Sequence, residues 1–189
     1  KILDNGRGLA RRKILKHKHE KETGRTSSIT HHYYVNNEHN KILSFVDLAG
    51  HEKYYKTTIF GVNGCSLDYI VLMIGSNMGV TKMTIEHLTL ILVLKIPFII
   101  VFSKIDICPP NIYKQSFNTL TKLLKKYKIY HELKEIDTLD TSTQNFNFTD
   151  SKVIPYFNVS NVKGNNIDLL RDFLLNIKNV YNWQELKLQ

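Results

Sequence analysis

The sequence is poor in cysteine and proline. It has 189 residues, of which 2 are cysteines and 4 are prolines. Cys65 and Cys108 cannot build a disulfide framework, and no Cys-x-x-Cys pair is present to hold a metal. We therefore expect two reduced thiols in a cytoplasmic protein, which excludes the disulfide-stapled secreted domains.

Long hydrophobic runs are also absent. The most apolar stretch, residues 88–102, is interrupted by Lys95 and Pro97. It is shorter than the roughly 20 apolar residues that a membrane-spanning helix needs. No apolar segment of a signal peptide follows residues 1–4. The sequence therefore predicts no membrane segment.

A third absence is that of glycine followed by lysine. The chain has 9 glycines, and none of them precedes a lysine. A Walker-type phosphate loop reads G-x-x-x-x-G-K-[ST] and needs that pair. These 189 residues therefore contain no such loop.

Positive charge is in excess. Lys and Arg number 26 against 17 Asp and Glu, so the net charge is +9. This balance favours an anionic partner, whether nucleic acid, nucleotide or membrane surface. Residues 1–26 hold nine basic and three acidic residues. This segment is expected to be either a solvated arm or a surface that faces phosphate groups.

Four short apolar runs predict strands, and the two in the middle are nearly continuous and rich in Ile and Val. Such runs are typical of strands buried on both faces of a parallel sheet. The segments between them have the apolar spacing of helices, and Thr84 is the expected N-cap of the first. The alternation predicts an α/β sandwich with a parallel sheet. The strand runs are residues 42–46, 69–74, 97–102 and 153–159, and the helical segments are residues 84–94, 111–127 and 167–177.

Two other segments complete the expected fold. Residues 30–35 alternate weakly and precede the first apolar run by a short polar turn. This predicts an antiparallel hairpin that joins an edge strand to the sheet. Residues 137–150 are polar and are expected to form a surface loop.

The strongest chemical signal directly follows the first apolar run, as Asp47-Leu48-Ala49-Gly50-His51-Glu52. Open α/β sheets bind ligands at the carboxyl ends of their strands, where Asp47 can hold a water on Mg²⁺. Gly50 allows a backbone N–H to approach a phosphate without a Cβ clash. His51 can position an attacking water.

A second motif, Ser103-Lys104-Ile105-Asp106, follows the third run. The Asp106 carboxylate can accept hydrogen bonds from N1–H and the 2-amino group of guanine, whereas adenine offers neither donor. The aliphatic part of Lys104 can pack over the base.

Two weaker motifs complete the set. The turn around Ser160 and Asn161, after the fourth run, can direct a backbone N–H to the guanine 6-oxo group. Upstream of the hairpin, Thr26 can supply a hydroxyl to Mg²⁺, which prefers oxygen ligands.

The order of these motifs at strand ends resembles the G domain of translational GTPases, the relatives of elongation factors Tu and 1-alpha. Within that group the sequence is most similar to the GTP-binding protein 1 and 2 family. The resemblance covers nearly the whole chain and is clearest over residues 3–109 and 154–174. It depends on Leu3-Asp4-Asn5-Gly6-Arg7-Gly8, His17-Lys18-His19-Glu20, Gly24-Arg25-Thr26-Ser27-Ser28, Asp47-Leu48-Ala49-Gly50-His51-Glu52-Lys53-Tyr54 and Gly75-Ser76-Asn77.

The resemblance implies a three-layer α/β sandwich of the P-loop NTPase class, with a mostly parallel sheet and an antiparallel edge hairpin. It also implies a GTPase that uses GTP or GDP and Mg²⁺, with the ribosome or RNA as partner. Asp47 and Asp106 would lie at opposite ends of one guanine nucleotide, at the edge of one sheet. The implied roles are Mg²⁺ binding by Thr26 and Asp47, γ-phosphate contact by Thr26 and Gly50, water orientation by His51, and guanine binding by Ser103, Lys104, Asp106, Ser160 and Asn161.

The sequence departs from the family pattern at a few positions. Ser103 stands where the family has the Asn that ties this loop to the phosphate loop, so one brace is weakened. Ala49 replaces a common Pro and Asn161 a common Ala, and neither change removes a reacting group.

The absent phosphate loop is the largest departure. In the family, this loop and its preceding strand come just before the segment that matches Leu3, so the sequence is expected to be N-terminally incomplete. The strand would be central, between the hairpin and the strand at residues 69–74. We therefore expect the fragment to bind GTP weakly or not at all. The expected divisions are a basic switch I-like segment (1–29), a G-domain core (30–180) and the start of a linker to following β-barrel domains (181–189).

Two other functions stay open at this point. One is a nucleotide-free pseudo-GTPase that serves as an interaction module. The other is a basic RNA-binding domain that uses residues 7–25, whose affinity would depend strongly on salt.

Overall fold

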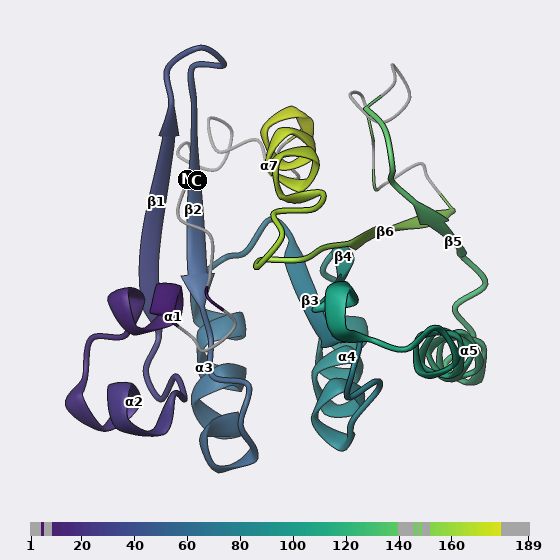
Figure 1. Cartoon of the computed structure of the whole chain (residues 1–189), viewed down its shortest axis with the longest axis horizontal. Coiled ribbons are helices and arrows are strands. Elements are labelled where there is room, and N and C mark those ends of the chain that lie inside the picture. The colour runs from purple at the N-terminus through teal and green to yellow at the C-terminus, as the bar shows by residue number, and fades with distance from the viewer. Residues whose placement is uncertain (1–4, 6–8, 140–145, 147, 149–151, 179–189) are drawn as a thin grey trace, which may run out of the picture.

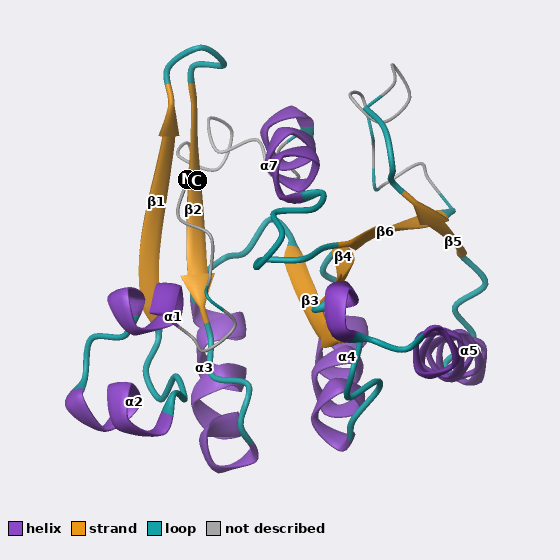
Figure 2. Cartoon of the chain, in the orientation of Figure 1, coloured by secondary structure: helices purple, strands orange, loops and turns teal. Residues whose placement is uncertain are grey.

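The computed structural model describes residues 5, 9–139, 146, 148 and 152–178 (Figure 1). Two short helices precede a hairpin, after which strands and helices alternate (Figure 2). The strands are β1 Thr30–Asn36, β2 Lys41–Asp47, β3 Ile70–Gly75, β4 Phe98–Ser103, β5 Glu132–Glu135 and β6 Val153–Asn158. The α-helices are α1 Leu9–Ile14, α2 Lys18–Thr23, α3 Tyr55–Gly64, α4 Lys82–Leu94, α5 Pro110–Lys126 and α7 Ile167–Asn176.

The main sheet has the strand order β3-β4-β6-β5, and its neighbouring strands are parallel. Strand β4 is its buried centre, because Ile99, Ile100, Val101 and Phe102 are all 0% exposed. Ile100 and Phe102 pack with α4 and α5, whereas Ile99 and Val101 face the opposite side and pack with Phe173 of α7. The predicted three-layer α/β fold is confirmed.

Helix α4 begins earlier than the sequence predicted. Its N-cap is Thr81, so the expectation that Thr84 caps the helix is wrong. Two hydroxyls three residues apart explain the difference. Thr84 N–H donates to Thr81 Oγ1, and Thr81 N–H donates to Thr84 Oγ1, each at 3.2 Å. Thr84 therefore fills the third helical position of a capping box.

The hairpin forms a sheet of its own. Strands β1 and β2 pair antiparallel over seven residue pairs, from Thr30↔Asp47 to Asn36↔Lys41. Among the described residues no strand joins them to β3, so the expected attachment of the hairpin to the main sheet is not seen. Lys41 instead ties the hairpin to the end of α7, because its Nζ donates to the carbonyls of Leu175 at 3.0 Å and Ile177 at 2.6 Å.

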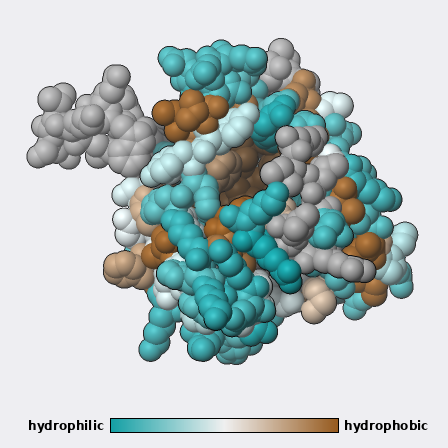
Figure 3. Space-filling view, turned by 60° about the vertical axis from the view of Figure 1, so that its left-hand side comes forward, coloured by the Kyte–Doolittle hydropathy of each residue, from teal (hydrophilic) through white to brown (hydrophobic). Residues whose placement is uncertain are grey.

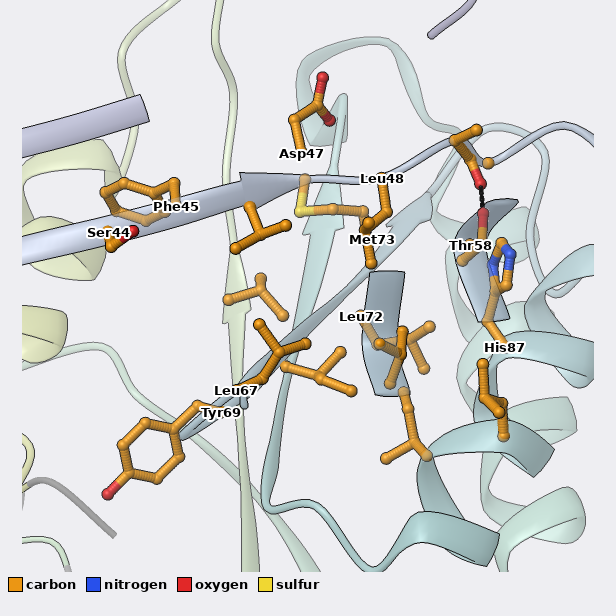
Figure 4. Close-up of a pocket in the computed structure, with 18 residues that line it drawn as sticks. Ser44, Phe45, Asp47, Leu48, Thr58, Leu67, Tyr69, Leu72, Met73 and His87 are labelled. Atoms are coloured by element: carbon orange, nitrogen blue, oxygen red, sulfur yellow. Dashed lines mark hydrogen bonds between the residues drawn. The ribbon is translucent and has the colours of Figure 1, made fainter. Parts of the chain in front are cut away.

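Strands β2 and β3 run in the same direction without pairing (Figure 1). The space between them, here called the β2–β3 slot, is a cavity of about 430 Å³. It lies between residues 44–50 of β2 and its following loop and residues 69–73 around β3, with side chains of α3 and α4 completing the wall (Figure 4). From the hairpin side, the space-filling view shows a hollow with hydrophobic residues inside it and hydrophilic residues below it (Figure 3). The slot lies where the sequence analysis expected a further strand.

Several elements were not predicted. They are α1, α2, α3 and the short polar edge strand β5. The expected surface loop at residues 137–150 lies largely outside the described residues. However, its Phe146 is 8% exposed and packs against Phe173, so this part belongs to the core. No helix within the described residues is both long enough and apolar enough to span a bilayer.

Candidate functional site

Asp47 is the last residue of β2 and meets Thr26, which comes from the loop before β1. The Thr26 hydroxyl donates to Asp47 Oδ2 at 3.2 Å, and Thr26 is only 4% exposed. The hairpin thus brings a hydroxyl and a carboxylate together from distant parts of the sequence. One hydroxyl and one carboxylate are oxygen donors of the kind that Mg²⁺ accepts when phosphate oxygens and waters supply the other positions. The donor set therefore fits that ion.

Helix α3 fixes the loop that follows Asp47. The Thr58 hydroxyl donates to the carbonyl of Ala49 at 2.5 Å, and both residues are buried. Gly50 next to them is exposed, and a Cβ added there would meet no atom within 4 Å. Its backbone therefore lies in the open and can be approached by a ligand.

His51 caps the short 3-10 turn Glu52–Tyr54 that follows. Its Nδ1 accepts a hydrogen bond from the N–H of Lys53 at 3.1 Å. An imidazole nitrogen that accepts a hydrogen bond carries no proton, so a neutral ring has its proton on Nε2. This leaves Nε2–H as the group through which His51 can act.

The two loops expected to hold a base are brought together by the main sheet. Strands β4 and β6 are parallel neighbours, so the loops that follow them lie at the same edge. Val159 N–H donates to the Phe102 carbonyl at 2.8 Å, and Ile105 N–H donates to the Val159 carbonyl at 3.4 Å. Lys104 and Asp106 therefore lie on a loop that is tied to the loop carrying Ser160.

The backbone of these loops is shaped for tight turns. Lys104 has a positive φ of 61°, and Asp106 lies in the 3-10 turn Ile105–Ile107 that follows. Ser160 is 0% exposed and acts as an internal brace. Its Oγ accepts from Lys163 N–H at 3.1 Å, and its carbonyl accepts from Gly164 N–H at 2.8 Å.

Asn161 directly follows Ser160 and is exposed. The two residues therefore differ in what they can do. Ser160 stabilises the turn from inside, while the Asn161 side chain is accessible to a ligand.

Ser103 bonds to the end of the neighbouring strand. Its Oγ donates to the Ile74 carbonyl at 3.4 Å, and its own carbonyl accepts from Ser76 N–H at 2.9 Å. These contacts tie the ends of β3 and β4 together. The residue that departs from the family motif therefore has a structural contact of its own in place of the expected brace.

The candidate residues fall into two groups. Thr26, Asp47, Gly50 and His51 lie on or beside the hairpin, and the others follow β4 and β6. Since β2 and β3 run in the same direction, both groups lie toward the carboxyl ends of strands on the same side of the molecule (Figure 1). The expectation that Asp47 and Asp106 share the edge of one sheet is wrong, because the slot separates β2 from β3. The second group is Ser103, Lys104, Asp106, Ser160 and Asn161.

Glu20 of α2, which is 1% exposed, was not among the site residues predicted from the sequence. Burial alone would raise the pKa of its carboxyl, but hydrogen bonds from Ser27, His17 and Ser28 outweigh it and lower the pKa to about 2. Hydropathy does not separate this acid from the exposed Glu22 two residues later. The signals in the sequence were the His17-Lys18-His19-Glu20 motif and the serines at positions 27 and 28, which supply donors after the turn at Gly24.

Within the described residues, no three or more His, Cys, Asp or Glu side chains gather as a metal cluster. A cation at this site would therefore depend on Asp47, on hydroxyl oxygens and on its ligand. This arrangement suits a metal that arrives with a phosphate more than one held by the protein alone.

These features define an α/β domain with candidate site residues in the loops at the carboxyl ends of its strands, one loop bearing an Asp-x-x-Gly motif and one a Lys-x-Asp motif. The sequence pattern of the elongation factor Tu GTP-binding domain matches residues 4–179. The chain belongs to this family, as the resemblance implied.

Known relatives agree with this assignment. The chain is 43% identical to GTP-binding protein 1 of Xenopus laevis, over 91% of the chain and 30% of that protein. It is 37% identical to human GTP-binding protein 2, over 91% of the chain and 32% of that protein. The chain thus spans about a third of the length of these relatives.

A solved structure has the same fold. The crystal structure of a bacterial selenocysteine-specific elongation factor is 23% identical and superimposes with a TM-score of 0.60, covering 84% of this chain and 23% of that one.

Proposed function

We propose that this chain is the guanine-specific, water-positioning part of a translation-factor-like GTPase. The contact between the Thr26 hydroxyl and Asp47 carries the proposal, because it assembles an Mg²⁺-compatible pair beside the exposed backbone of Gly50. The linked loops after β4 and β6 support it, since they bring Asp106 and Asn161 to the same side of the molecule.

The proposed reaction is hydrolysis of GTP to GDP and phosphate. Water forms a bond to the γ-phosphorus while the bond from that phosphorus to the β–γ bridging oxygen breaks, and the proton that the water loses passes to an oxygen of the phosphate that is released. Mg²⁺ bound with the nucleotide supplies charge neutralisation on the phosphates. Thr26 and Asp47 hold the metal side of the ligand, the N–H of Gly50 donates to the γ-phosphate, and His51 orients the water through Nε2. Such donors stabilise developing charge rather than act as strong bases.

The phosphate side of this site is incomplete within the 189 residues, which have no Gly-Lys pair. In a phosphate loop, a nest of backbone N–H groups and the lysine supply most of the β- and γ-phosphate binding. We therefore expect this chain alone to bind GTP weakly. A micromolar dissociation constant for GTP at millimolar Mg²⁺ would contradict that expectation.

Guanine recognition is tested by Asp106→Asn. In the unsubstituted chain, the Asp106 carboxylate accepts two hydrogen bonds from guanine. In the variant, the asparagine amide donates to the 2-oxo group of xanthine instead. The variant is expected to lose affinity for GDP and gain affinity for XDP, each by at least about tenfold. Binding is measured by competition against a fluorescent nucleotide at millimolar concentrations. Asp137→Asn, which changes an exposed carboxylate outside the proposed site, is the matched control.

Two outcomes decide between the open alternatives. Affinities of the Asp106→Asn variant for GDP and XDP that both equal those of the unsubstituted chain would refute base recognition by this residue. Detectable guanine binding without hydrolysis, even when a phosphate loop is supplied, would favour a pseudo-GTPase that serves as an interaction module.

A second candidate function is RNA or ribosome binding by the segment containing α1 and α2. It is favoured by six basic side chains that are exposed there, which are Arg12, Lys13, Lys16, Lys18, Lys21 and Arg25. Neutralised phosphates release counterions, so the affinity would fall steeply with salt. Salt-dependent RNA binding that is unchanged by GTP would support this function over the GTPase.

We also propose that the protein is cytoplasmic and that β-barrel domains follow this domain.

A further inference from the structure

Glu20 is the one carboxylate among the buried side chains of the described residues. Its Oε1 accepts three hydrogen bonds, from Ser27 N–H at 2.7 Å, Ser27 Oγ at 2.8 Å and Ser28 Oγ at 3.3 Å. Its Oε2 accepts a fourth from His17 N–H at 3.2 Å. A buried carboxylate with this many donors is held firmly, and its partners are held with it.

The bonds to Glu20 close a loop. Helix α2 ends at Gly24, which has a φ of 66° and whose N–H donates to the Glu20 carbonyl at 2.7 Å. Glycine adopts this left-handed conformation without a Cβ clash, and the chain reverses there at the end of the six-residue helix. Ser27 thereby returns to the Glu20 side chain.

His19 supports the loop from the other side. Its Nε2 lies 2.7 Å from Ser27 Oγ. Because Ser27 gives its one hydroxyl proton to Glu20, His19 is the donor in this contact. Ser27 is therefore held by both side chains as well as by its own backbone N–H.

Thr26 directly precedes Ser27 in this loop. The Glu20 bonds fix the backbone on its C-terminal side, and its own hydroxyl donates to Asp47 at 3.2 Å. The position of Thr26 is thus determined by contacts within the chain. In switch GTPases, the equivalent order commonly depends on the γ-phosphate and its Mg²⁺.

We propose that Glu20 is a positioning residue that holds Thr26 beside Asp47 by fixing the loop that contains Thr26 and Ser27. The role of Thr26 in Mg²⁺ binding rests on the proposed function. The bonds that Glu20 accepts from residues 17, 27 and 28, here called the Glu20 clamp, can be tested without nucleotide.

The first test is Glu20→Gln in the 189-residue chain, with Glu22→Gln as matched control. Both acids lie on α2 and both changes remove one charge, but Glu22 is exposed. The glutamine amide keeps the shape of Glu20 but offers a weaker, uncharged acceptor. Trypsin cleavage after the exposed Arg25, followed by mass spectrometry, reports opening of the loop. Glu20→Gln is expected to raise that rate about tenfold, and Glu22→Gln to change it less than about twofold.

Cleavage after Lys95, at the end of α4, separates local opening from global unfolding. If cleavage there rises together with cleavage after Arg25, Glu20 serves general stability and the proposal is overturned. Equal rates after Arg25 in both variants overturn it as well.

A second measurement applies if the Glu20→Gln variant fails to fold. In the unsubstituted chain without nucleotide, the Ser27 amide hydrogen should exchange at least about tenfold slower than in an unstructured peptide. Free exchange of that amide refutes the clamp. Failure of the chain to bind GTP would refute the proposed function and leave this protection unaffected, so the two ideas fail separately.

Discussion

A strand added to the chain tests the β2–β3 slot directly. The perturbation is a fusion of six residues of Val and Ile, the length of β3, joined to the N-terminus by about 20 Gly and Ser residues. Because both β2 and β3 have an edge without a strand partner in the described residues, the added strand can pair on both sides. We expect it to stabilise the domain.

The size of the effect follows from the slot. Burying six Val and Ile side chains in the slot at about 1.5–2 kcal/mol each contributes about 10 kcal/mol. One backbone hydrogen bond for each added residue, half of the number that full pairing on both sides would form, adds about 6 kcal/mol. Ordering six residues costs about 9 kcal/mol, and closing a 20-residue linker costs about 3 kcal/mol. About 4 kcal/mol remains, which for a domain of this size raises Tm by about 10 °C.

Thermal unfolding followed by circular dichroism measures the shift, and amide exchange shows where the strand binds. The control fusion has proline at two of the six positions, which removes ladder N–H groups and prevents pairing. Equal melting temperatures of the two fusions would show that the added strand does not pair in the slot. Pairing in the slot is also refuted if protection appears along the outer edge of β1 or β5 and the β3 amides stay unprotected.

Three further predictions concern single side chains. Thr58→Val removes the hydroxyl that donates to Ala49 and should lower the free energy of unfolding by about 1–2 kcal/mol in urea, whereas Thr58→Ser should retain most of it; equal losses would contradict a role for the hydroxyl. Phe173→Ala removes a ring that is 0% exposed and packs against Phe157, so it should lower the free energy of unfolding by about 3–5 kcal/mol. A urea midpoint near that of the unsubstituted chain would be inconsistent with this packing. The pKa of Glu20 is lowered to about 2 in the folded chain, so its carboxylate adds stability above the usual pKa of a glutamate, and this contribution is lost as pH falls toward 2. Urea titrations between pH 5 and 2 should show this loss in the unsubstituted chain but not in Glu20→Gln, and identical pH dependence would count against it.

The sheet and its motifs could be predicted because their signals are local. The β4 strand is buried on both faces, so its residues read as one continuous apolar run. The motifs at Asp47 and Asp106 directly follow such runs, so their location at strand ends follows from the chain order. Polar edge strand β5, of sequence Glu-Leu-Lys-Glu, carries no such signal because only one of its residues is partly buried.

The start of α4 shows how a local signal can still be ambiguous. Both Thr81 and Thr84 are hydroxyl residues at an expected helix start, and either could cap it. The difference between them lies in backbone conformation, since Thr81 is extended with a ψ of 171° while Thr84 is helical. That conformation depends on where the preceding chain leaves β3.

The sequence by itself determined the strand runs, the three-layer class and the residue types at each strand end, because side-chain burial and turn chemistry are written in neighbouring residues. Only the tertiary structure decided that the Thr26 hydroxyl lies at the Asp47 carboxylate, that Glu20 is buried among its donors, and that no described strand joins the hairpin to the main sheet. Thr26 and Asp47 are 21 residues apart, and the donors to Glu20, although they lie within eight residues of it, reach its carboxylate only because the chain reverses at Gly24. A buried carboxylate such as Glu20 is stable only where several donors converge, and their convergence is a property of the folded chain.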